Sequence, residues 1–373
     1  MPRWSSVSGV PPPGPAQPPE RRPRVPAPTR RAGALALLAS FLLGGCTAPL
    51  LPVFTVSGDA PSRTGLTPLG EGAVFGNDAG RVIRLDGAGH VLWTVETGGE
   101  IELPLVVTED SVVGAVSGGE TLVALDGDTG HELWRAGGQP EVAALAAVGT
   151  RILLVGREGE LRSFSAQSGG MPQRRGWNTS LGVKSQAPPR GLVALDGAVL
   201  AIGPAAVLLL SAQDGALRWK TLLREATGAV PDGERIWLVE QAGRLVALDR
   251  RSGAQRRVVP LGQRAASPPS LALGRIWVGL EDRSLLGIDV RGSEPPWRAT
   301  LPAALVGGVA EWQDRVLVPT AGNEGRLLAI DLARPGSPAT ARVDSPLRTR
   351  PLVHGGVAWV LAADGRALGF RFR

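Results

Sequence analysis

The sequence is poor in the residues from which most catalytic and metal sites are built. Its 373 residues include one cysteine, Cys46, no tyrosine, and three histidines that each stand alone, His90, His131 and His354. Metal sites built from one isolated histidine are uncommon, because a metal needs several ligands close together. Neither a Gly-x-Ser-x-Gly motif nor a phosphate-binding glycine-rich loop before a helix is present. The sequence therefore predicts no catalytic residues, no metal and no cofactor.

Helical patterning and long apolar runs are also scarce. Helical periodicity is nearly absent after the first 45 residues, and the apolar run Ala32–Leu43 has twelve residues, too few to span a bilayer. Glycine, with 51 residues, and proline, with 32, are abundant instead. This composition is typical of an all-β protein with many turns.

One short pattern recurs along the chain. Thr121–Trp134, TLVALDGDTGHELW, reads as a strand (Thr121–Leu125), a turn (Asp126–Gly130) and a second strand (His131–Trp134). Further copies end at Trp93, Trp219, Arg257 and Trp297, and weaker copies cover Leu161–Gly170, Arg326–Ser337 and Arg366–Arg373.

The copies recur with a period near forty. Aligned at the turn, they give Asp86, Asp126, Ser165, Ser211, Asp249, Asp289, Asp331 and Arg371, which are 38 to 46 residues apart. A β-rich repeat of this period predicts an array of sheets, and eight copies predict eight sheets. Each copy also has two upstream strand-like runs, such as Pro104–Val107 and Ser111–Val116. Four strands per unit is the content of a propeller blade.

The pattern resembles the PQQ-type repeat of quinoprotein-like eight-bladed β-propellers, over about Leu50–Arg373. A turn aspartate can accept hydrogen bonds from the N–H groups that follow it, and tryptophan brings the largest apolar area to a seam between blades. The resemblance implies turn caps at Asp86, Asp126, Ser165, Ser211, Asp249, Asp289 and Asp331, and inter-blade packing by Trp93, Trp134, Trp177, Trp219 and Trp297. The related enzymes use PQQ and Ca²⁺ beneath a pair of adjacent cysteines, which this chain lacks.

The two ends of the repeat region should complete one blade. The last unit, Arg350–Arg373, has three strand-like runs and no fourth, whereas Leu51–Val56 is β-prone and has no complete blade directly after it. We expect Leu51–Val56 to supply the fourth strand, which closes the ring and covers an open edge. No linker divides the remainder, so residues 46–373 should form one propeller domain, with an extra stretch at Asn178–Arg190 outside the third blade.

Residues 1–45 read as a leader. They contain six of the 40 basic residues and one of the 34 acidic ones, so the leader carries +5 and the rest of the chain +1. The basic net charge therefore gives no reason to expect nucleic-acid binding by the propeller. The Pro/Arg-rich Met1–Thr29 should be disordered, and Arg30 and Arg31 before Ala32–Leu43 are typical of a secretory signal peptide.

The leader ends in Leu43-Gly44-Gly45-Cys46, which resembles the bacterial lipobox. In lipoproteins of this type the chain is cut before the cysteine, which then carries diacylglycerol and anchors the protein to a membrane. Thr47 stands where an inner-membrane retention signal would usually be Asp, which favours the periplasmic face of the outer membrane. The alternative is a buried free cysteine in an ordinary exported protein.

Lipobox, repeat type, blade number and size together resemble the BamB family, the lipoprotein scaffolds of the outer-membrane β-barrel assembly machinery. The resemblance implies a non-enzymatic, lipid-anchored envelope scaffold that binds partner proteins through its propeller loops. Two alternatives stay open. One is a PQQ- or metal-binding, periplasmic oxidoreductase-like protein. The other is a ligand- or polysaccharide-binding propeller with a polar, aromatic-lined central funnel.

Overall fold

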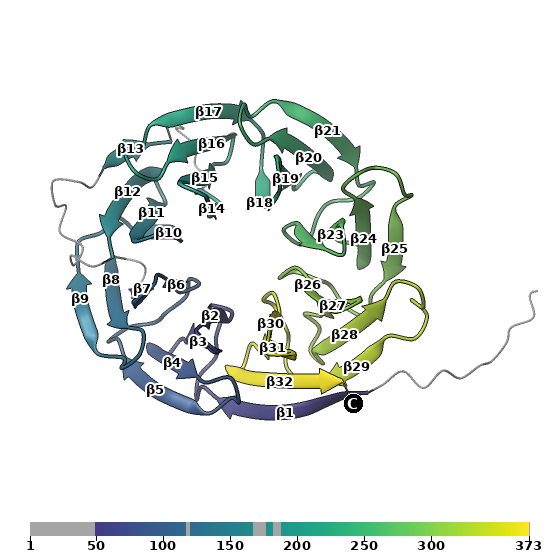
Figure 1. Cartoon of the computed structure of the whole chain (residues 1–373), viewed down its shortest axis with the longest axis horizontal. Coiled ribbons are helices and arrows are strands. Elements are labelled where there is room, and N and C mark those ends of the chain that lie inside the picture. Colours follow the sequence, from purple (N-terminus) through teal and green to yellow (C-terminus); the bar gives the residue numbers. More distant parts are fainter. Residues whose placement is uncertain (1–48, 117–119, 167–176, 182–187, 373) are drawn as a thin grey trace, which may run out of the picture. The chain divides into compact units, whose positions relative to one another are not determined.

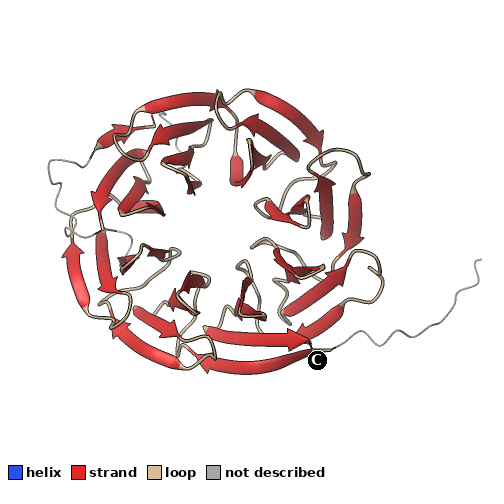
Figure 2. Ribbon diagram, viewed as in Figure 1, coloured by secondary structure: helices blue, strands red, loops and turns tan. Residues whose placement is uncertain are grey.

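The computed structural model describes residues 49–116, 120–166, 177–181 and 188–372. These residues form 32 strands in eight four-stranded antiparallel sheets. The sheets follow one another around a central axis as the blades of a propeller (Figure 1, Figure 2). The predicted all-β, eight-bladed fold is therefore confirmed. Within these described ranges, no helix is long and apolar enough to cross a membrane.

In seven blades the four strands follow the chain outward, from an inner strand beside the axis to an outer strand at the rim (Figure 1). Blade one has β2 (Thr67–Leu69), β3 (Gly72–Gly76), β4 (Arg81–Leu85) and β5 (Val91–Glu96), and blade two has β6 (Val106–Val107), β7 (Ser111–Val116), β8 (Thr121–Asp126) and β9 (Glu132–Ala136). Blade three has β10 (Val142–Val148), β11 (Arg151–Gly156), β12 (Glu160–Ser165) and β13 (Asn178–Ser180), and blade four has β14 (Gly191–Leu195), β15 (Ala198–Ile202), β16 (Ala206–Ser211) and β17 (Leu217–Leu222). Blade five has β18 (Ala226–Asp232), β19 (Arg235–Glu240), β20 (Arg244–Asp249) and β21 (Gln255–Pro260), and blade six has β22 (Ser270–Ala272), β23 (Arg275–Gly279), β24 (Ser284–Asp289) and β25 (Trp297–Thr300). Blade seven has β26 (Ala310–Trp312), β27 (Arg315–Pro319), β28 (Arg326–Asp331) and β29 (Ala339–Arg342).

Blade eight joins the two ends of the described chain. Its inner strands are β30 (Leu352–His354), β31 (Val357–Leu361) and β32 (Arg366–Phe372), and its outer strand is β1 (Leu50–Ser57). β1 runs antiparallel to β32, from the pair Leu50 and Phe372 to the pair Ser57 and Arg366. The expected closure of the ring by the N-terminal strand is therefore confirmed.

The two faces of the ring carry different connections, because every blade is an antiparallel meander. One face carries the hairpins between first and second strands and the turns between third and fourth strands, and we call it the turn face. The connection face carries the turns between second and third strands and the links from one blade to the next. Leu50 and Phe372, where the described chain begins and ends in blade eight, lie on the turn face.

The second and third strands of each blade form most of the core. In β7, β15 and β31 every residue is buried, since blades cover these strands on both sides. The core clusters span neighbouring blades: one of them joins Leu200 and Leu209 of blade four to Ile236 and Leu248 of blade five. Continuous apolar strands of this kind fix the blades against each other as a rigid ring.

The third blade ends later than the sequence suggested. Asn178–Ser180 forms the outer strand β13 and pairs with β12, with Thr179 opposite Leu161, so these residues are part of the blade and not of an inserted stretch. Trp93, Trp134, Trp219 and Trp297 of other copies lie within the outer strands of their blades. Here the tryptophan precedes the strand, although its carbonyl still accepts a bond from the N–H of Ser163 at 3.0 Å.

Candidate functional site

Aspartates stabilise the turns between third and fourth strands on the turn face. The Oδ1 atom of Asp126 accepts bonds from the N–H groups of Asp128 at 3.1 Å and Thr129 at 2.7 Å, and from the Thr129 hydroxyl at 2.7 Å. Corresponding bonds within their own turns are accepted by Asp86, Asp249, Asp289 and Asp331. These carboxylates are thus occupied by the backbone beside them.

The turn bonds lower the pKa of each of these carboxyls below its ordinary value of 3.8. For Asp249 the largest cause of the lowered pKa is the bond from the N–H of Ser252. For Asp289, burial acts to raise the pKa, but the N–H groups of Glu294 and Ser293 outweigh it and lower the pKa to about 2. All five side chains are charged at neutral pH and accept hydrogen bonds that cap their turns.

The two serine positions differ from the aspartates. Ser211 lies at the end of β16, and its side chain hydrogen-bonds to Asp214, which also accepts the N–H of Ala216 at 3.1 Å. The capping carboxylate of this turn is therefore Asp214, which the alignment at Ser211 did not single out. Ser165 ends β12, and the residues that follow Ala166 lie outside the described ranges.

Tryptophans in the outer strands, or directly before them, reach across the seam to the turn of the next blade. The indole N–H of Trp219 donates to the carbonyl of Arg250 at 3.0 Å. The same bond joins Trp93 to Gly127 (3.2 Å), Trp134 to Ala166 (2.8 Å) and Trp177 to Ala212 (3.0 Å). In all four bonds the accepting carbonyl belongs to the residue directly after the aligned turn residue. The turn face is thus hydrogen-bonded from blade one to blade five.

A glycine with positive φ lies against the ring at three of these seams. Gly253 has a φ of 70°, and a Cβ atom there would lie 2.6 Å from Cε3 of Trp219. Gly130 and Gly215 lie against the rings of Trp93 and Trp177 in the same way. Only glycine combines this backbone conformation with so close an approach, which explains the glycine at the end of these turns.

Two seams use other residues. Arg257 occupies the tryptophan position of blade five, and its Nη1 atom donates to the carbonyl of Asp289 at 2.9 Å. At the eighth seam Phe54 of β1 lies against Gly89 of blade one. The ring of Trp297 packs edge-on against Trp277 of its own blade, with ring centroids 5.2 Å apart, beside a cluster that extends into blade seven.

A charged cleft of about 390 Å³ opens on the turn face between blades four and five. Its charged lining comes from the hairpins and turns of both blades and from Arg218 near the start of β17: Asp196, Arg218, Glu234, Arg250 and Arg251. Arg250 Nη2 lies 3.0 Å from Asp196 Oδ2, and Arg251 Nη2 lies 3.2 Å from Glu234 Oε1. The floor is apolar and includes Leu195 and Leu209. Both ion pairs are largely exposed, so they hold the cleft only weakly.

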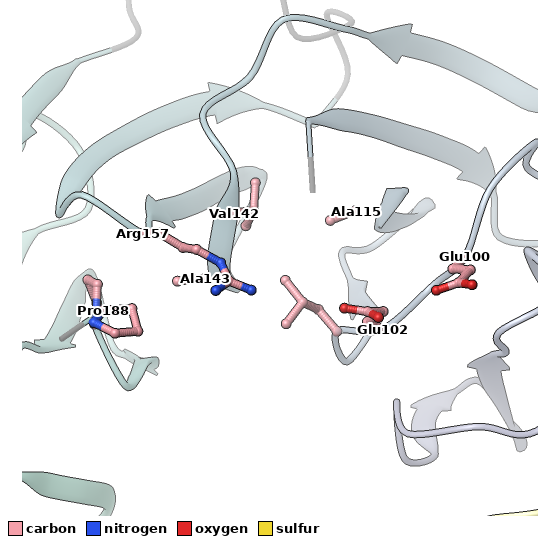
Figure 3. A pocket seen from close by; sticks show the side chains of 9 residues that line it. Glu100, Glu102, Ala115, Val142, Ala143, Arg157 and Pro188 are labelled. Carbon is pink, nitrogen blue, oxygen red and sulfur yellow. The ribbon is translucent and has the colours of Figure 1, made fainter. Parts of the chain in front are cut away.

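A smaller cavity of about 180 Å³ lies on the connection face near blades two and three. Glu100 and Glu102 approach it from the link between blades one and two, and Arg157 approaches it from the opposite side (Figure 3). Val142 and Ala143 of β10 supply its apolar wall (Figure 3). The Arg157 guanidinium is already paired with Glu141, at 2.6 Å from Nε to Oε1.

The described residues contain neither a cluster of metal-ligating side chains nor an exposed aromatic side chain on the inner strands. No group of three or more His, Cys, Asp or Glu side chains there is arranged to hold a metal ion. The His90 ring lies 3.1 Å from the carboxylate of Asp86, and the His354 ring lies 3.3 Å from that of Glu71. The eight inner strands contain one Trp, Phe or Tyr residue, Trp312, and it is buried. No exposed aromatic side chain therefore lines the funnel along these strands.

Cys46, the expected lipidation site, lies outside the described residues, four positions before Leu50. The structure thus brings the predicted turn and tryptophan positions together at the seams of the turn face. It also shows a cleft that sequence reasoning missed. Asp196 and Arg250 are 54 residues apart in the chain, and no local signal could have paired them.

Comparison with known proteins connects this architecture to a family. No curated protein sequence matches the chain. Solved structures that match include BamB from Moraxella catarrhalis (17% identity, 87% of this chain and 98% of that one, TM-score 0.71), the computationally designed protein Ika8 (15%, 88% and 100%, TM-score 0.69) and Sqt1 from Saccharomyces cerevisiae (10%, 88% and 100%, TM-score 0.69). At these identities the structures show the fold alone. The model of the family described as outer membrane protein assembly factor BamB matches residues 78–231, 157–304 and 206–333, which together cover more than half of the sequence, and the chain therefore belongs to the BamB family.

Proposed function

We propose that this protein is an exported lipoprotein, acylated at Cys46, whose propeller acts as a scaffold for partner proteins in outer-membrane β-barrel assembly. Membership of the BamB family, whose description names outer-membrane protein assembly, carries this proposal. The protein acts by binding rather than by catalysis. A rigid ring with hydrogen-bonded seams suits that role, because it holds loops from distant parts of the chain in fixed positions.

The leader supports the anchor. The signal-like run Ala32–Leu43 leads directly to the lipobox-like Leu43–Cys46, and Cys46 is the only cysteine of the chain. An Asp directly after the lipidated cysteine would retain a lipoprotein in the inner membrane. Thr47 stands at this position, so the lipoprotein is directed to the outer membrane. Residues 1–45 are then removed, and residues 46–373 form the mature protein at the periplasmic face of that membrane.

The charged cleft between blades four and five is our candidate docking site for the partner. In an eight-bladed ring, blade four lies opposite blade eight, as the positions of β17 and β1 in Figure 1 show. A protein anchored through β1 therefore holds this cleft on the side of the ring farthest from the anchor. A partner in the periplasm reaches it without competition from the membrane.

The chemistry of the cleft indicates what it binds. Three arginines face two carboxylates, and the ion pairs Arg250–Asp196 and Arg251–Glu234 are exposed enough to exchange for others. An incoming segment with acidic side chains can pair bidentately with these guanidinium groups while its apolar side chains cover Leu195 and Leu209. The cleft thus suits a loop or strand of a partner protein with mixed acidic and apolar character.

The test is purification of the full-length lipidated protein in detergent from its own membranes, followed by mass spectrometry of the proteins that accompany it. A barrel-assembly protein with periplasmic repeat domains should co-purify with the unaltered protein. It should be lost severalfold from the double variant Arg250→Glu/Arg251→Glu. Arg264→Glu is the matched control, since Arg264 also forms an exposed ion pair, with Glu281 at 3.2 Å, but in links on the connection face.

The outcomes separate the scaffold role from the cleft. If the propeller comes down alone, or with an unrelated envelope complex, the assembly role is refuted. If the assembly partner remains bound to the double variant as well as to the control, the scaffold role stands and the cleft is the wrong surface. Equal melting temperatures of the two variants exclude unfolding as the cause of a loss.

A further inference from the structure

Exposed large apolar side chains lie on two parts of the rim, blades eight, one and two and blades four and five. Eight large hydrophobic residues of the described chain are exposed, and all of them lie on outer strands. Five belong to three consecutive blades: Leu51 and Val53 on β1, Val91 and Leu92 on β5, and Leu133 on β9. Between 42% and 53% of each of these five side chains is accessible to solvent.

The same part of the rim has no charge over two of these blades. β1, which reads LLPVFTVS, contains no charged residue, and β5, VLWTVE, has none before Glu96 at its connection-face end. The outer strands of blades four to seven all carry exposed basic residues: Arg218, Lys220, Arg256, Arg298 and Arg342. We call Leu51, Pro52, Val53, Val91 and Leu92 the apolar rim sector. The sector itself contains no ionised side chain and has one exposed basic neighbour, Arg371, opposite Leu51 on β32, whereas the opposite rim carries several ionised side chains that covering would desolvate.

The apolar rim sector lies beside the proposed lipid anchor. Cys46 precedes Leu50 by four residues, and four extended residues span at most about 14 Å. Acyl chains on Cys46 therefore hold the turn-face end of β1 within that distance of the lipid headgroups. Leu51 and Val53 follow directly in the same strand. A tether this short leaves the ring little freedom to turn a different part of its rim toward the bilayer.

We propose that the apolar rim sector of blades eight and one rests on the surface of the membrane in which Cys46 is anchored. The ring then stands with its rim against the bilayer, and the cleft between blades four and five points away from it. This inference rests on the proposed lipid anchor and adds the orientation of the ring to it. We infer that the sector contacts the lipid surface and not a protein, because the sector contains no charged residue and continues into the strand that is tethered to Cys46.

Single-cysteine labelling tests the proposal in the lipidated protein. Because the thiol of Cys46 is blocked in the lipoprotein, a cysteine introduced elsewhere is the only reactive one. Val53→Cys and Leu92→Cys place an environment-sensitive NBD label in the sector. Val258→Cys is the matched control, since Val258 lies on the outer strand of blade five and is 45% exposed, as is Val53. The labelled proteins are reconstituted in vesicles of phosphatidylethanolamine and phosphatidylglycerol, with and without nitroxide-bearing lipids.

We expect labels at positions 53 and 92 to shift to the blue on reconstitution and to lose most of their emission to the nitroxide lipids, while the label at 258 stays as in water. Water-like emission at all three positions, in protein that floats with the vesicles, overturns this inference and leaves the anchor intact. A blue shift without nitroxide quenching shows that a second copy or another protein covers the sector, and also overturns it. Protein that does not float refutes the anchor itself.

Discussion

The ring of Phe54 lies directly against Gly89, so that a Cβ atom on the glycine would come 2.3 Å from Cγ of the phenylalanine. Trp219 and Gly253 have the same relationship between blades four and five. Phe54 also contacts Trp359 of blade eight, with ring centroids 4.5 Å apart at 64°. The N-terminal strand thus does two things. It adds the missing fourth strand to blade eight and supplies the aromatic ring that fills the seam to blade one.

Removing this ring should loosen the closure. We expect Phe54→Ala to lower the free energy of unfolding by about 2–4 kcal/mol, because a large, partly buried aromatic side chain is lost and the surrounding strands cannot collapse into the space. Deletion of residues 47–60 should lower the melting temperature further, since it opens blade eight along the whole of β32. Thermal unfolding followed by circular dichroism measures both. Thr55→Ala, at an exposed neighbouring position, is the control.

An unchanged melting temperature in the 47–60 deletion would mean that the ring is held by its other seams alone. In that case β1 would be an accessory to the propeller, and the pairing of Leu50–Ser57 with β32 would contribute no measurable stability.

The glycines at the seams offer a second test. Gly253→Ala places a methyl group 2.6 Å from the Trp219 ring on a backbone with positive φ. Strain and overpacking together should cost about 2–4 kcal/mol of stability. Gly233 also has positive φ but has no atom within 4 Å of its added Cβ, so Gly233→Ala should cost only about 1 kcal/mol for the backbone strain. Denaturant unfolding of the two variants compares them; equal losses would show that the ring contact is unimportant.

The sequence predicts the fold well because the information is local and repeated. A strand, a turn and a strand near Thr121–Trp134 recur about every forty residues, and each copy alone indicates β-structure. The closing strand was also predictable, since an incomplete last unit and an isolated first strand leave one arrangement that buries both edges.

The sequence could not reveal which residues fill the irregular seams or form the cleft. Arg257 bonds across its seam and Phe54 packs into another, although neither is the tryptophan that the repeat pattern has at this position. Their residue types alone therefore did not predict these contacts. Asp214 caps its turn from three residues beyond the aligned serine. The cleft is lined by residues of both blade four and blade five, so it depends on how two blades pack together and not on any one repeat.

The turn carboxylates should make stability depend on acid. The pKa of Asp289 is about 2 in the folded protein against an ordinary value of 3.8, so its contribution is complete above pH 3.8 and is lost as the pH falls toward 2. Asp289→Ala should therefore lower the melting temperature at pH 7, and the difference from the unaltered protein should shrink at pH 2.5. Thermal scans at both pH values measure it. Asp314→Ala, at a carboxylate that is 72% exposed, should change little at either pH; a pH-independent effect of Asp289→Ala would contradict the role of its charge.

The anchor and the sorting signal can be separated by two adjacent substitutions. Cys46→Ala removes the sulfur that would receive diacylglycerol, so the variant should incorporate no labelled palmitate and should retain its leader. Thr47→Asp leaves that sulfur in place but introduces the inner-membrane retention signal, so it should incorporate palmitate fully and move to the inner-membrane fraction. Metabolic labelling followed by separation of the two membranes on a density gradient measures both effects. Palmitate incorporation by Cys46→Ala would show that Cys46 is not the acylated residue, because no other cysteine exists to accept the lipid through sulfur.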